Sequence, residues 1–416
     1  MTDAVENIER EVDHLYRHSF GKMVASLMYF SKDIDLETAE DLVQDSFATA
    51  FYAWQNDGIP TNPGGWIFTV CRNKAINKIK ASRRTRGFYD HEDFETEARV
   101  LSESVLEDQQ LKMLFACAND ELAPKVQVVI TLKYVVNLKV EAISKILGMS
   151  IDGVDKLLLR ARQKIRNEKI LLTEPDPSTL AGRLPIVHKM IYLLFNEGYK
   201  SSWGKEILRE ELCEEALILN KSLLDSGIGN KETAALHSLM LFNAARFKAR
   251  FGSRGELLDL EEQDRSLWNR DLIMYGAKFM AQSRGGRISQ YQYEATIAYL
   301  HCIAKDFQTT DWSAISDIYK QLLQLYPNPF VELSYAISLY YAGQKGKARR
   351  ILHDLKQQPF LNQYYLLNAT LGKISLMDGN LAAAKDYFEK TIRQTDFQVE
   401  KDYVQRLLSR IALISS

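Results

Sequence analysis

The chain is 416 residues long, which is too long for one hydrophobic core and predicts two to three domains. Hydrophobic residues make up 46% and charged residues 26%, as in soluble globular proteins, and no apolar run reaches the roughly 18 residues of a membrane span. The net charge of -1 does not favour nucleic-acid binding, but this average hides a segregation of charge along the chain.

Basic residues gather in two segments that flank an acidic one. Residues 72–86 carry seven basic side chains and no acidic one, and residues 156–169 carry six against the single Glu168. Between them, residues 87–110 carry eight acidic side chains against the single Arg99. This order predicts two DNA-facing modules on an acidic tether, although two solvated helix faces would give the same charges.

The chain is predicted to be all-α, because it has only nine prolines, lacks strand-like alternation and repeats apolar residues at steps of three and four. Residues 87–108 lack an apolar stripe, and two prolines within 173–178 stop any helix. We therefore expect domains at 1–86, 109–172 and 179–416, with 87–108 as an acidic linker.

An internal repeat predicts tetratricopeptide-like hairpins at about 328–396. Residues 342–352 (AGQKGKARRIL) align with residues 378–388 (DGNLAAAKDYF). Both contain a turn glycine, then a small residue and then a large apolar one, at Gly343/Gly379, Ala348/Ala384 and Leu352/Phe388. The small residue lets two helices approach, and stacked hairpins of this kind make concave binding surfaces.

Residues 36–54 (LETAEDLVQDSFATAFYAW) predict an amphipathic helix capped by Asp35. Its apolar stripe is expected to be buried and consists of Ala39, Leu42, Val43, Phe47, Ala50, Phe51 and Trp54. The opposite face carries Glu40, Asp41, Gln44 and Asp45, which on periodicity alone is explained by a solvated surface.

Residues 66–84 (WIFTVCRNKAINKIKASRR) predict a second helix, which follows a turn at 62–65. One face is expected to pack inward through Phe68, Cys71, Ala75 and Ile79. The opposite face aligns Trp66, Asn73, Asn77, Lys80 and Arg84. Amides donate to and accept from base edges, cations meet phosphates and an aromatic ring offers a stacking plane, so this face suits partly unpaired DNA.

Residues 140–166 predict a helix-turn-helix, with a first helix at 140–147, a turn at 148–150 and a second helix capped by Ser150. The second helix of such a motif enters the major groove. Its inner stripe is Val154, Leu157, Leu158, Ala161 and Ile165. Its outward residues are Asp152, Lys156, Leu159, Arg160 and Gln163. A plain helical hairpin is the alternative.

These two modules, in this order, resemble regions 2 and 4 of extracytoplasmic-function sigma factors, which belong to the sigma-70 family and direct RNA polymerase to promoters. The similarity rests on AEDLVQDSFATAFYAW with PGGWIFTVCRNKAINKIKASRR, and on LxP, LxxxAISKILGMS and RARQKIR. Gly153 and Asp155 depart from the family's frequent Thr and Lys.

The resemblance implies that the polymerase β′ clamp helices bind Asp41, Gln44 and Asp45. It implies that −10 promoter DNA is read by the helix bearing Asn73 and Asn77, where we also expect Trp66, Lys80 and Arg84 to act. It implies that −35 DNA is read by the second helix of the motif, through Lys156, Leu159, Arg160 and Gln163.

The remaining residues resemble the C-terminal extension of a sigma-factor group with a tetratricopeptide-like tail, through 183–199, 260–273 and 310–329. In that group the extension is thought to control the sigma part, so we expect an unknown protein or small-molecule ligand as its partner. No cofactor or metal is expected, since His14 and His18 show no third ligand. The four cysteines form no CxxC pair, which predicts buried thiols in a cytoplasmic protein.

Two other classes of function stay open. A helix-turn-helix regulator with a repeat-based sensor would explain the second module but not the Asn-bearing helix of the first. An enzyme would need its site in 179–416. The candidates there are Glu197, Asp264, Arg265, Trp268, Asp311 and Trp312, which buried ion pairs and packing explain as well. We expect a promoter-specificity subunit of RNA polymerase that is not itself an enzyme.

Overall fold

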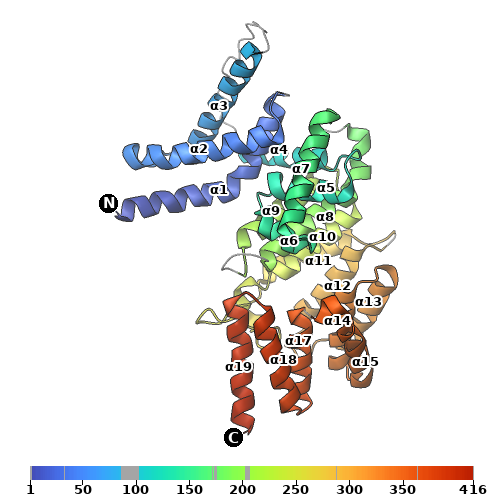
Figure 1. The fold of residues 1–416 in the computed structure, drawn as a ribbon. Coiled ribbons are helices and arrows are strands. Elements are labelled where there is room, and N and C mark those ends of the chain that lie inside the picture. The colour runs from blue at the N-terminus through green and yellow to red at the C-terminus, as the bar shows by residue number, and fades with distance from the viewer. Residues whose placement is uncertain are drawn as a thin grey trace. The chain divides into compact units, whose positions relative to one another are not determined.

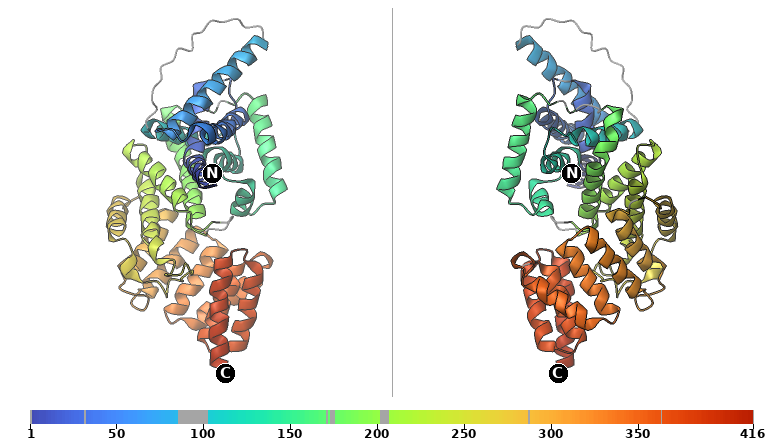
Figure 2. Two further views of the ribbon diagram at one scale, coloured as in Figure 1. Left: turned by 90° about the vertical axis from the view of Figure 1, so that its left-hand side faces the viewer. Right: turned by 90° about the vertical axis from the view of Figure 1, so that its right-hand side faces the viewer.

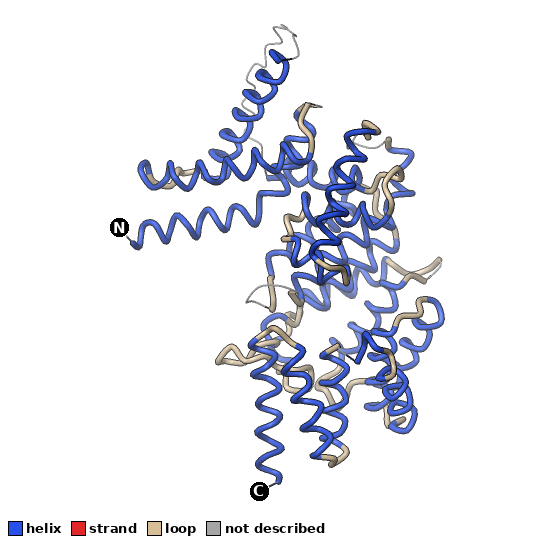
Figure 3. The backbone as a smooth tube through the Cα atoms, viewed as in Figure 1, coloured by secondary structure: helices blue, strands red, loops and turns tan. Residues whose placement is uncertain are grey.

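The structure, a computed structural model, describes residues 2–31, 33–85, 103–170, 172, 176–201, 207–286, 288–362 and 364–415. These residues form helices, which confirms the predicted all-α class, and their one extended feature is a bridge between Phe251 and Leu257 (Figure 3). No helix in the described ranges is long and apolar enough to cross a membrane. Most of the predicted acidic linker lies outside the described residues.

The chain divides into two compact units. The first comprises Met1–Trp203 and Arg209–Ile228, and the second comprises Gly204–Leu208 and Gly229–Ser416. The helices of the first unit (Figure 1) are α1 (Thr2–Phe30), α2 (Leu36–Asp57), α3 (Pro63–Thr85), α4 (Glu103–Cys117), α5 (Pro124–Ile130), the π-helix η1 (Thr131–Val135), α6 (Val140–Leu147), α7 (Ile151–Asn167), the 3-10 turn η2 (Pro177–Thr179), α8 (Leu180–Tyr199) and α9 (Glu210–Asp225).

Helix α2 packs against both α1 and α3, and its start is fixed as predicted. The Asp35 side chain accepts a hydrogen bond from the backbone N–H of Thr38 at 2.9 Å. The apolar stripe of α2 is buried at Val43, Phe47, Ala50 and Trp54, although Leu42 and Phe51 are only half-buried.

Helix α3 begins three residues earlier than predicted. The Asn62 side chain accepts a hydrogen bond from the N–H of Gly65 at 2.9 Å, and Pro63 occupies the first helical position. Proline has no N–H to lose at that position, and its φ suits a helix. The predicted turn at 62–65 is therefore the capped first turn of the helix.

The helix-turn-helix has the predicted bounds to within a residue. Helix α6 ends at Leu147, Gly148 adopts a left-handed conformation with φ of 60°, and the Ser150 hydroxyl accepts from the N–H of Gly153 at 3.1 Å. Val154, Leu158 and Ala161 bury the inner face of α7, which orients its other face toward solvent.

The first unit extends beyond the boundary predicted at 179. Helices α8 and α9 both pack against α4, and so belong to the same compact unit as the two sigma-like modules. The Arg183 guanidinium of α8 donates to the carbonyl of Phe115 at 2.9 Å, and the Thr131 hydroxyl contacts the sulfur of Met190 at 3.3 Å. Helix α7 ends at Asn167 and the next helical turn begins at Pro177, yet α8 still belongs to the same compact unit.

A close approach of α1 to η1 requires glycine at position 21. A Cβ there would lie 1.7 Å from the backbone oxygen of Val135, which cannot swing aside as a side chain can. We expect Gly21→Ala to destabilise the first unit by about 1–3 kcal/mol, the usual cost of overpacking. Thermal unfolding followed by calorimetry measures the loss.

A matched control is Gly182→Ala, at an exposed position of α8 where the added Cβ meets nothing within 4 Å. Alanine is the better helix former by about 0.5–1 kcal/mol, so this change should stabilise the chain slightly. If both variants changed the unfolding temperature equally, the close contact at Gly21 would not be what limits stability.

The second unit contains α10 (Lys231–Ala244), the 3-10 turns η3 (Phe247–Ala249) and η4 (Arg265–Leu267), α11 (Arg270–Gln282), α12 (Gln290–Ile303), α13 (Trp312–Leu325), α14 (Pro329–Tyr341), α15 (Lys345–Lys356), α16 (Pro359–Asn362), α17 (Tyr365–Met377), α18 (Leu381–Gln394) and α19 (Gln398–Ser415). Its last helices stand side by side, with α18 between α17 and α19 (Figures 1 and 2).

Helices α14–α15 and α17–α18 form the two hairpins that the repeat predicts. The turn glycines adopt left-handed conformations, with φ of 83° at Gly343 and 78° at Gly379. The paired packing residues are buried at Ala348, Ala384, Leu352 and Phe388. Asp378 links the hairpins, since it accepts from the hydroxyl of Tyr340 at 2.8 Å and pairs with Arg349 at 2.7 Å.

Candidate nucleic-acid interface

Helix α3 presents a polar stripe to solvent, formed by Asn73, Asn77, Lys80 and Arg84, which we call the α3 stripe. All four side chains are exposed, and none is hydrogen-bonded to a residue that the structure describes. The opposite face holds Ile67, Cys71, Ala75 and Ile79, which are buried. The helix is thus anchored by one face while its amides and cations are free to meet another molecule.

Trp66 does not lie free on the α3 stripe as predicted. Its ring is half-buried and meets the buried Trp54 of α2 edge to face, with ring centroids 5.7 Å apart. The helical period places residue 66 near the stripe, but the period does not show that α2 brings another indole against it. Trp66 therefore offers only part of its surface for stacking.

The acidic face of α2 divides into an exposed and a buried part. Asp41, Gln44 and Asp45 are exposed, and Asp45 pairs with Lys74 of α3. Glu40, predicted to lie on the same outward face, is only 8% exposed. Its carboxylate lies 2.6 Å from the Nζ of Lys133 in η1. Glu40 is thus a contact between the two modules, because η1 packs where the sequence alone suggests solvent.

Helix α7 carries the four residues predicted to meet −35 DNA on its exposed face, namely Lys156, Leu159, Arg160 and Gln163. Leu159 is 49% exposed, as suits an apolar contact with a base. Lys156 pairs with Asp152 one turn earlier at 2.8 Å. Asp155 is also exposed, so a negative charge borders this surface.

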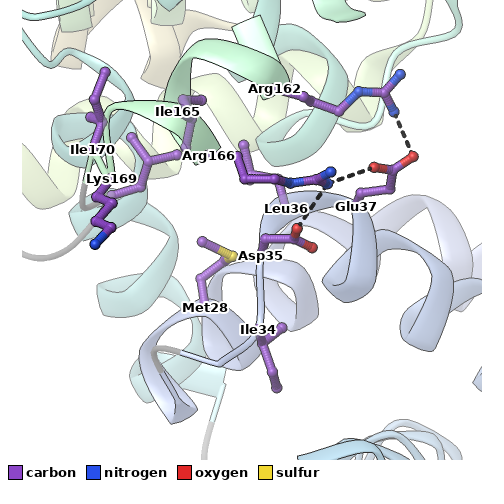
Figure 4. A pocket seen from close by; sticks show the side chains of 11 residues that line it. Met28, Ile34, Asp35, Leu36, Glu37, Arg162, Ile165, Arg166, Lys169 and Ile170 are labelled. Atoms are coloured by element: carbon purple, nitrogen blue, oxygen red, sulfur yellow. Dashed lines mark hydrogen bonds and ion pairs between the residues drawn. The ribbon is translucent and has the colours of Figure 1, made fainter. Parts of the chain in front are cut away.

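The C-terminal half of α7 contacts the start of α2, a contact that the sequence did not predict. Arg162 lies 3.3 Å from the Glu37 carboxylate, and Arg166 lies 3.3 Å from Asp35 and 3.5 Å from Glu37 (Figure 4). Partial burial opposes ionisation of Asp35, but hydrogen bonds from Thr38 and the charge of Arg166 outweigh it and hold the pKa of that carboxyl below its usual range. These ion pairs join the two modules predicted to bind DNA.

The half-buried carboxyl of Glu215 links α4 to α9, and we expect it to make the stability of the first unit depend on pH. Gln110 donates a hydrogen bond to Glu215, and burial raises the pKa of Glu215 to about 7. The folded chain therefore holds this proton more tightly than the unfolded chain, so the stabilisation is complete in acid and is lost as the pH rises from about 4.5 through 7.

We expect the unfolding midpoint of the first unit to fall between about pH 5 and pH 8, and Glu215→Gln to remove most of this fall. Solvent contact of the carboxyl limits the effect to about 1–2 kcal/mol. Calorimetry across the pH range measures it. Glu214→Gln, at the exposed neighbour, should retain the fall, and the same profile for both variants would refute the assignment.

A cavity of about 280 Å³ lies within the second unit. Its walls are largely apolar, with six aromatic side chains, and one side holds Lys373, which pairs with Asp259 and with Glu261 at 2.6 Å. Trp312, one of the residues weighed as a possible enzyme site, lines it and stacks on Tyr341. Arg265 instead donates to the carbonyl of His301 at 2.7 Å and is a packing residue, as the alternative interpretation held.

The histidine pair of α1 and the four cysteines show no feature of a metal site or a reactive thiol in the part of the chain that the structure describes. The rings of His14 and His18 lie 4.4 Å apart, and the residues searched contain no group of three or more side chains that could hold a metal ion. All four cysteines are buried. Burial raises the pKa of Cys71 to about 11 and that of Cys117 and Cys302 to about 12, so none of these three is an activated thiolate.

Three family models match segments of the chain. The model described as Sigma-70 region 2 matches residues 17–85, and the model described as Sigma-70, region 4 matches residues 112–165. Residues 183–284 match a family of unknown function, DUF6596, which extends across helices of both compact units. No solved structure matches the chain.

An uncharacterized protein of Rhizobium meliloti (strain 1021) is 30% identical over 398 residues, which cover 94% of this chain and 93% of the relative. The similarity therefore extends over both sigma modules and the helical extension. The α3 stripe lies in the part that matches region 2, and the helix-turn-helix lies in the part that matches region 4. The chain belongs to the sigma-70 family and is an RNA polymerase sigma factor, a subunit that binds the polymerase core and promoter DNA.

Proposed function

We propose that the chain is a sigma factor of the extracytoplasmic-function type in which each surface has its own partner. The acidic face of α2, with Asp41, Gln44 and Asp45, binds the clamp helices of the polymerase β′ subunit. The α3 stripe, with part of Trp66, grips the −10 element as it opens. Helix α7 docks on the −35 element through Lys156, Leu159, Arg160 and Gln163.

The observation that carries this proposal is the orientation of α3. Its amides and cations are exposed along one line, while Cys71, Ala75 and Ile79 are buried on the opposite side. A surface helix that only needed solubility would gain nothing from amides spaced one turn apart beside cations. Such a line suits exposed bases and the phosphates next to them.

The C-terminal extension is proposed to regulate the sigma part by binding a protein or a small molecule. Two features support this role. Helices α8 and α9 pack on α4 within the sigma-bearing unit, so the extension begins in contact with a sigma module. The second unit has a largely apolar cavity beside stacked hairpins, an arrangement that suits ligand or peptide binding.

Reconstituted transcription tests the proposal. Purified full-length chain is added to polymerase core lacking any other sigma factor, with a library of promoter DNA as template. We expect transcripts that start at a defined distance from shared −10 and −35 sequences. A chain that binds DNA but neither joins the core nor yields transcripts would be a helix-turn-helix regulator, and the proposal would be wrong.

A further inference from the structure

A cavity of about 340 Å³ lies where α7 meets the loop before α2, and we call it the α2–α7 cavity. Its walls come from both modules, with Met28, Ile34 and Leu36 on one side and Ile165, Ile170 and Leu172 on the other. Such a volume is within the range of small-molecule sites. At about 30 Å³ for each water, it has room for roughly eleven waters, or a ligand with about that number of non-hydrogen atoms.

The charges at the mouth of this cavity favour an anion. Asp35 and Glu37 are balanced by Arg166 and Arg162, the pairs drawn in Figure 4. Lys169 also lines the cavity and is exposed, and it forms no ion pair within the ranges that the structure describes. Among the lining residues that the structure describes, the mouth therefore carries one positive charge in excess, above walls that are mainly apolar.

The backbone at Lys169 is held in an uncommon conformation. Its φ is 52°, in the left-handed region that costs a residue with a side chain about 1–2 kcal/mol. The next residue, Ile170, donates its N–H to the carbonyl of Ile165 at 3.0 Å. This turn brings Ile170 and Leu172, both nearly buried, back over the cavity and leaves the lysine at the mouth.

The ion pairs at the cavity cannot persist when both modules occupy a promoter. The −10 and −35 elements lie about 25 base pairs apart, or about 85 Å at 3.4 Å per pair. In this structure helix α2 links the two DNA-facing helices through two ion pairs. Asp45 of α2 pairs with Lys74 of α3, and Glu37, eight residues earlier in α2, pairs with Arg162 of α7. Eight residues of helix span about 12 Å, and each ion pair adds roughly 10 Å between backbones. The backbones of α3 and α7 are therefore at most roughly 30 Å apart along this connection.

We infer that the α2–α7 cavity binds a small amphipathic anion, a carboxylate or phosphate on a single apolar chain, and that the bound anion holds the two modules together. The inference rests on the proposed function. The apolar chain lies among the Met, Ile and Leu walls, and the anionic group lies at Lys169 and Arg166. Because the cavity exists only while α7 contacts α2, the ligand stabilises the closed arrangement and opposes promoter binding. The volume excludes a two-chain phospholipid.

Binding is tested with decanoate as the probe, by calorimetry on the full-length chain without DNA or polymerase and below the concentration at which the probe forms micelles. We expect decanoate to bind, decylammonium to bind at least tenfold more weakly, and acetate to show no binding. Lys169→Glu should weaken decanoate binding at least tenfold. Ile165→Phe, which fills the cavity, should weaken it as well.

The matched control is Lys189→Glu, which reverses an exposed lysine of α8 outside the cavity and should leave decanoate binding unchanged. Circular dichroism shows whether each variant is folded, and the exposed position of Lys169 makes its replacement the safer test. Equal affinity for decanoate and decylammonium would show that the site does not select an anion. An unchanged affinity of the Lys169→Glu chain for decanoate would likewise refute the proposed site.

Closure is tested by transcription with polymerase core. At saturating decanoate, the concentration of chain needed for half-maximal transcription should rise at least tenfold, and the Lys169→Glu chain should escape this inhibition. Binding without inhibition would overturn the closing role. A chain that supports no transcription at all would instead refute the proposed function, while the calorimetry still decides whether the site exists.

Discussion

The double substitution Asn73→Ala with Asn77→Ala is expected to reduce promoter opening by about 30-fold or more, while binding to polymerase core stays within about twofold. Each amide contact to a base edge contributes about 1–3 kcal/mol, so losing two costs about 2–6 kcal/mol. Both side chains are exposed and have no partner among the described residues, so the fold should tolerate their loss. Permanganate reactivity of unpaired thymines measures opening, and fluorescence anisotropy measures binding to the core.

The matched control is Lys78→Ala on the same helix. Lys78 is exposed, but the helical period places it well away from the α3 stripe. Its loss should leave opening nearly intact beyond a small change in salt dependence. If the control and the double variant lose opening equally, general electrostatic attraction explains the helix and base reading does not.

Replacing Asp41 and Asp45 together by alanine should have the opposite effect, weakening polymerase binding by about 30-fold or more. Charged residues central to an interface commonly contribute 2 kcal/mol or more. Asp41 is exposed and forms no ion pair or hydrogen bond with a described side chain, whereas Asp45 already pairs with Lys74. We therefore expect Asp41→Ala alone to account for the larger share. Anisotropy with labelled chain and purified core measures both.

Two further variants separate the loss of these carboxylates from the loss of the Asp45–Lys74 ion pair and from a general change in net charge. Lys74→Ala breaks the same pair without removing a carboxylate, so it isolates any effect of freeing Asp45. Glu9→Ala removes an exposed carboxylate of α1, away from the acidic face of α2, and should leave core binding unchanged. A Glu9→Ala loss as large as that of the double variant would show that net charge, not this face, governs the affinity.

Local sequence patterns predicted the structure correctly where a short segment determines its own conformation. Asp35 and Ser150 cap their helices through their own side chains, and Gly148 supplies the left-handed turn between α6 and α7. The apolar period of α3 also predicted the burial of Cys71, Ala75 and Ile79, although Phe68, expected on the same face, is only half-buried. The hairpin repeat was visible because Gly343 and Gly379 recur at the same point of each copy.

Contacts between distant segments were not predictable in the same way. Glu40 and Trp66 were each placed outward by period, and each is covered by an element that the period does not describe, η1 for Glu40 and α2 for Trp66. The pairing of Glu37 with Arg162 joins residues more than a hundred positions apart, and the charges alone fit many pairings. The α2–α7 cavity depends on that pairing and so was also missed.

The membership of α8 and α9 in the first unit has a practical consequence for exchanging tails between sigma factors. A graft joined near position 175 would strip the partners of Phe115 and Gln110 from α4, leaving apolar surface and a glutamine without its carboxyl partner. A graft joined after Ile228 would instead keep the first unit intact and exchange the second unit from Gly229 onward. Chimeras of the second kind should remain folded and report what each tail senses.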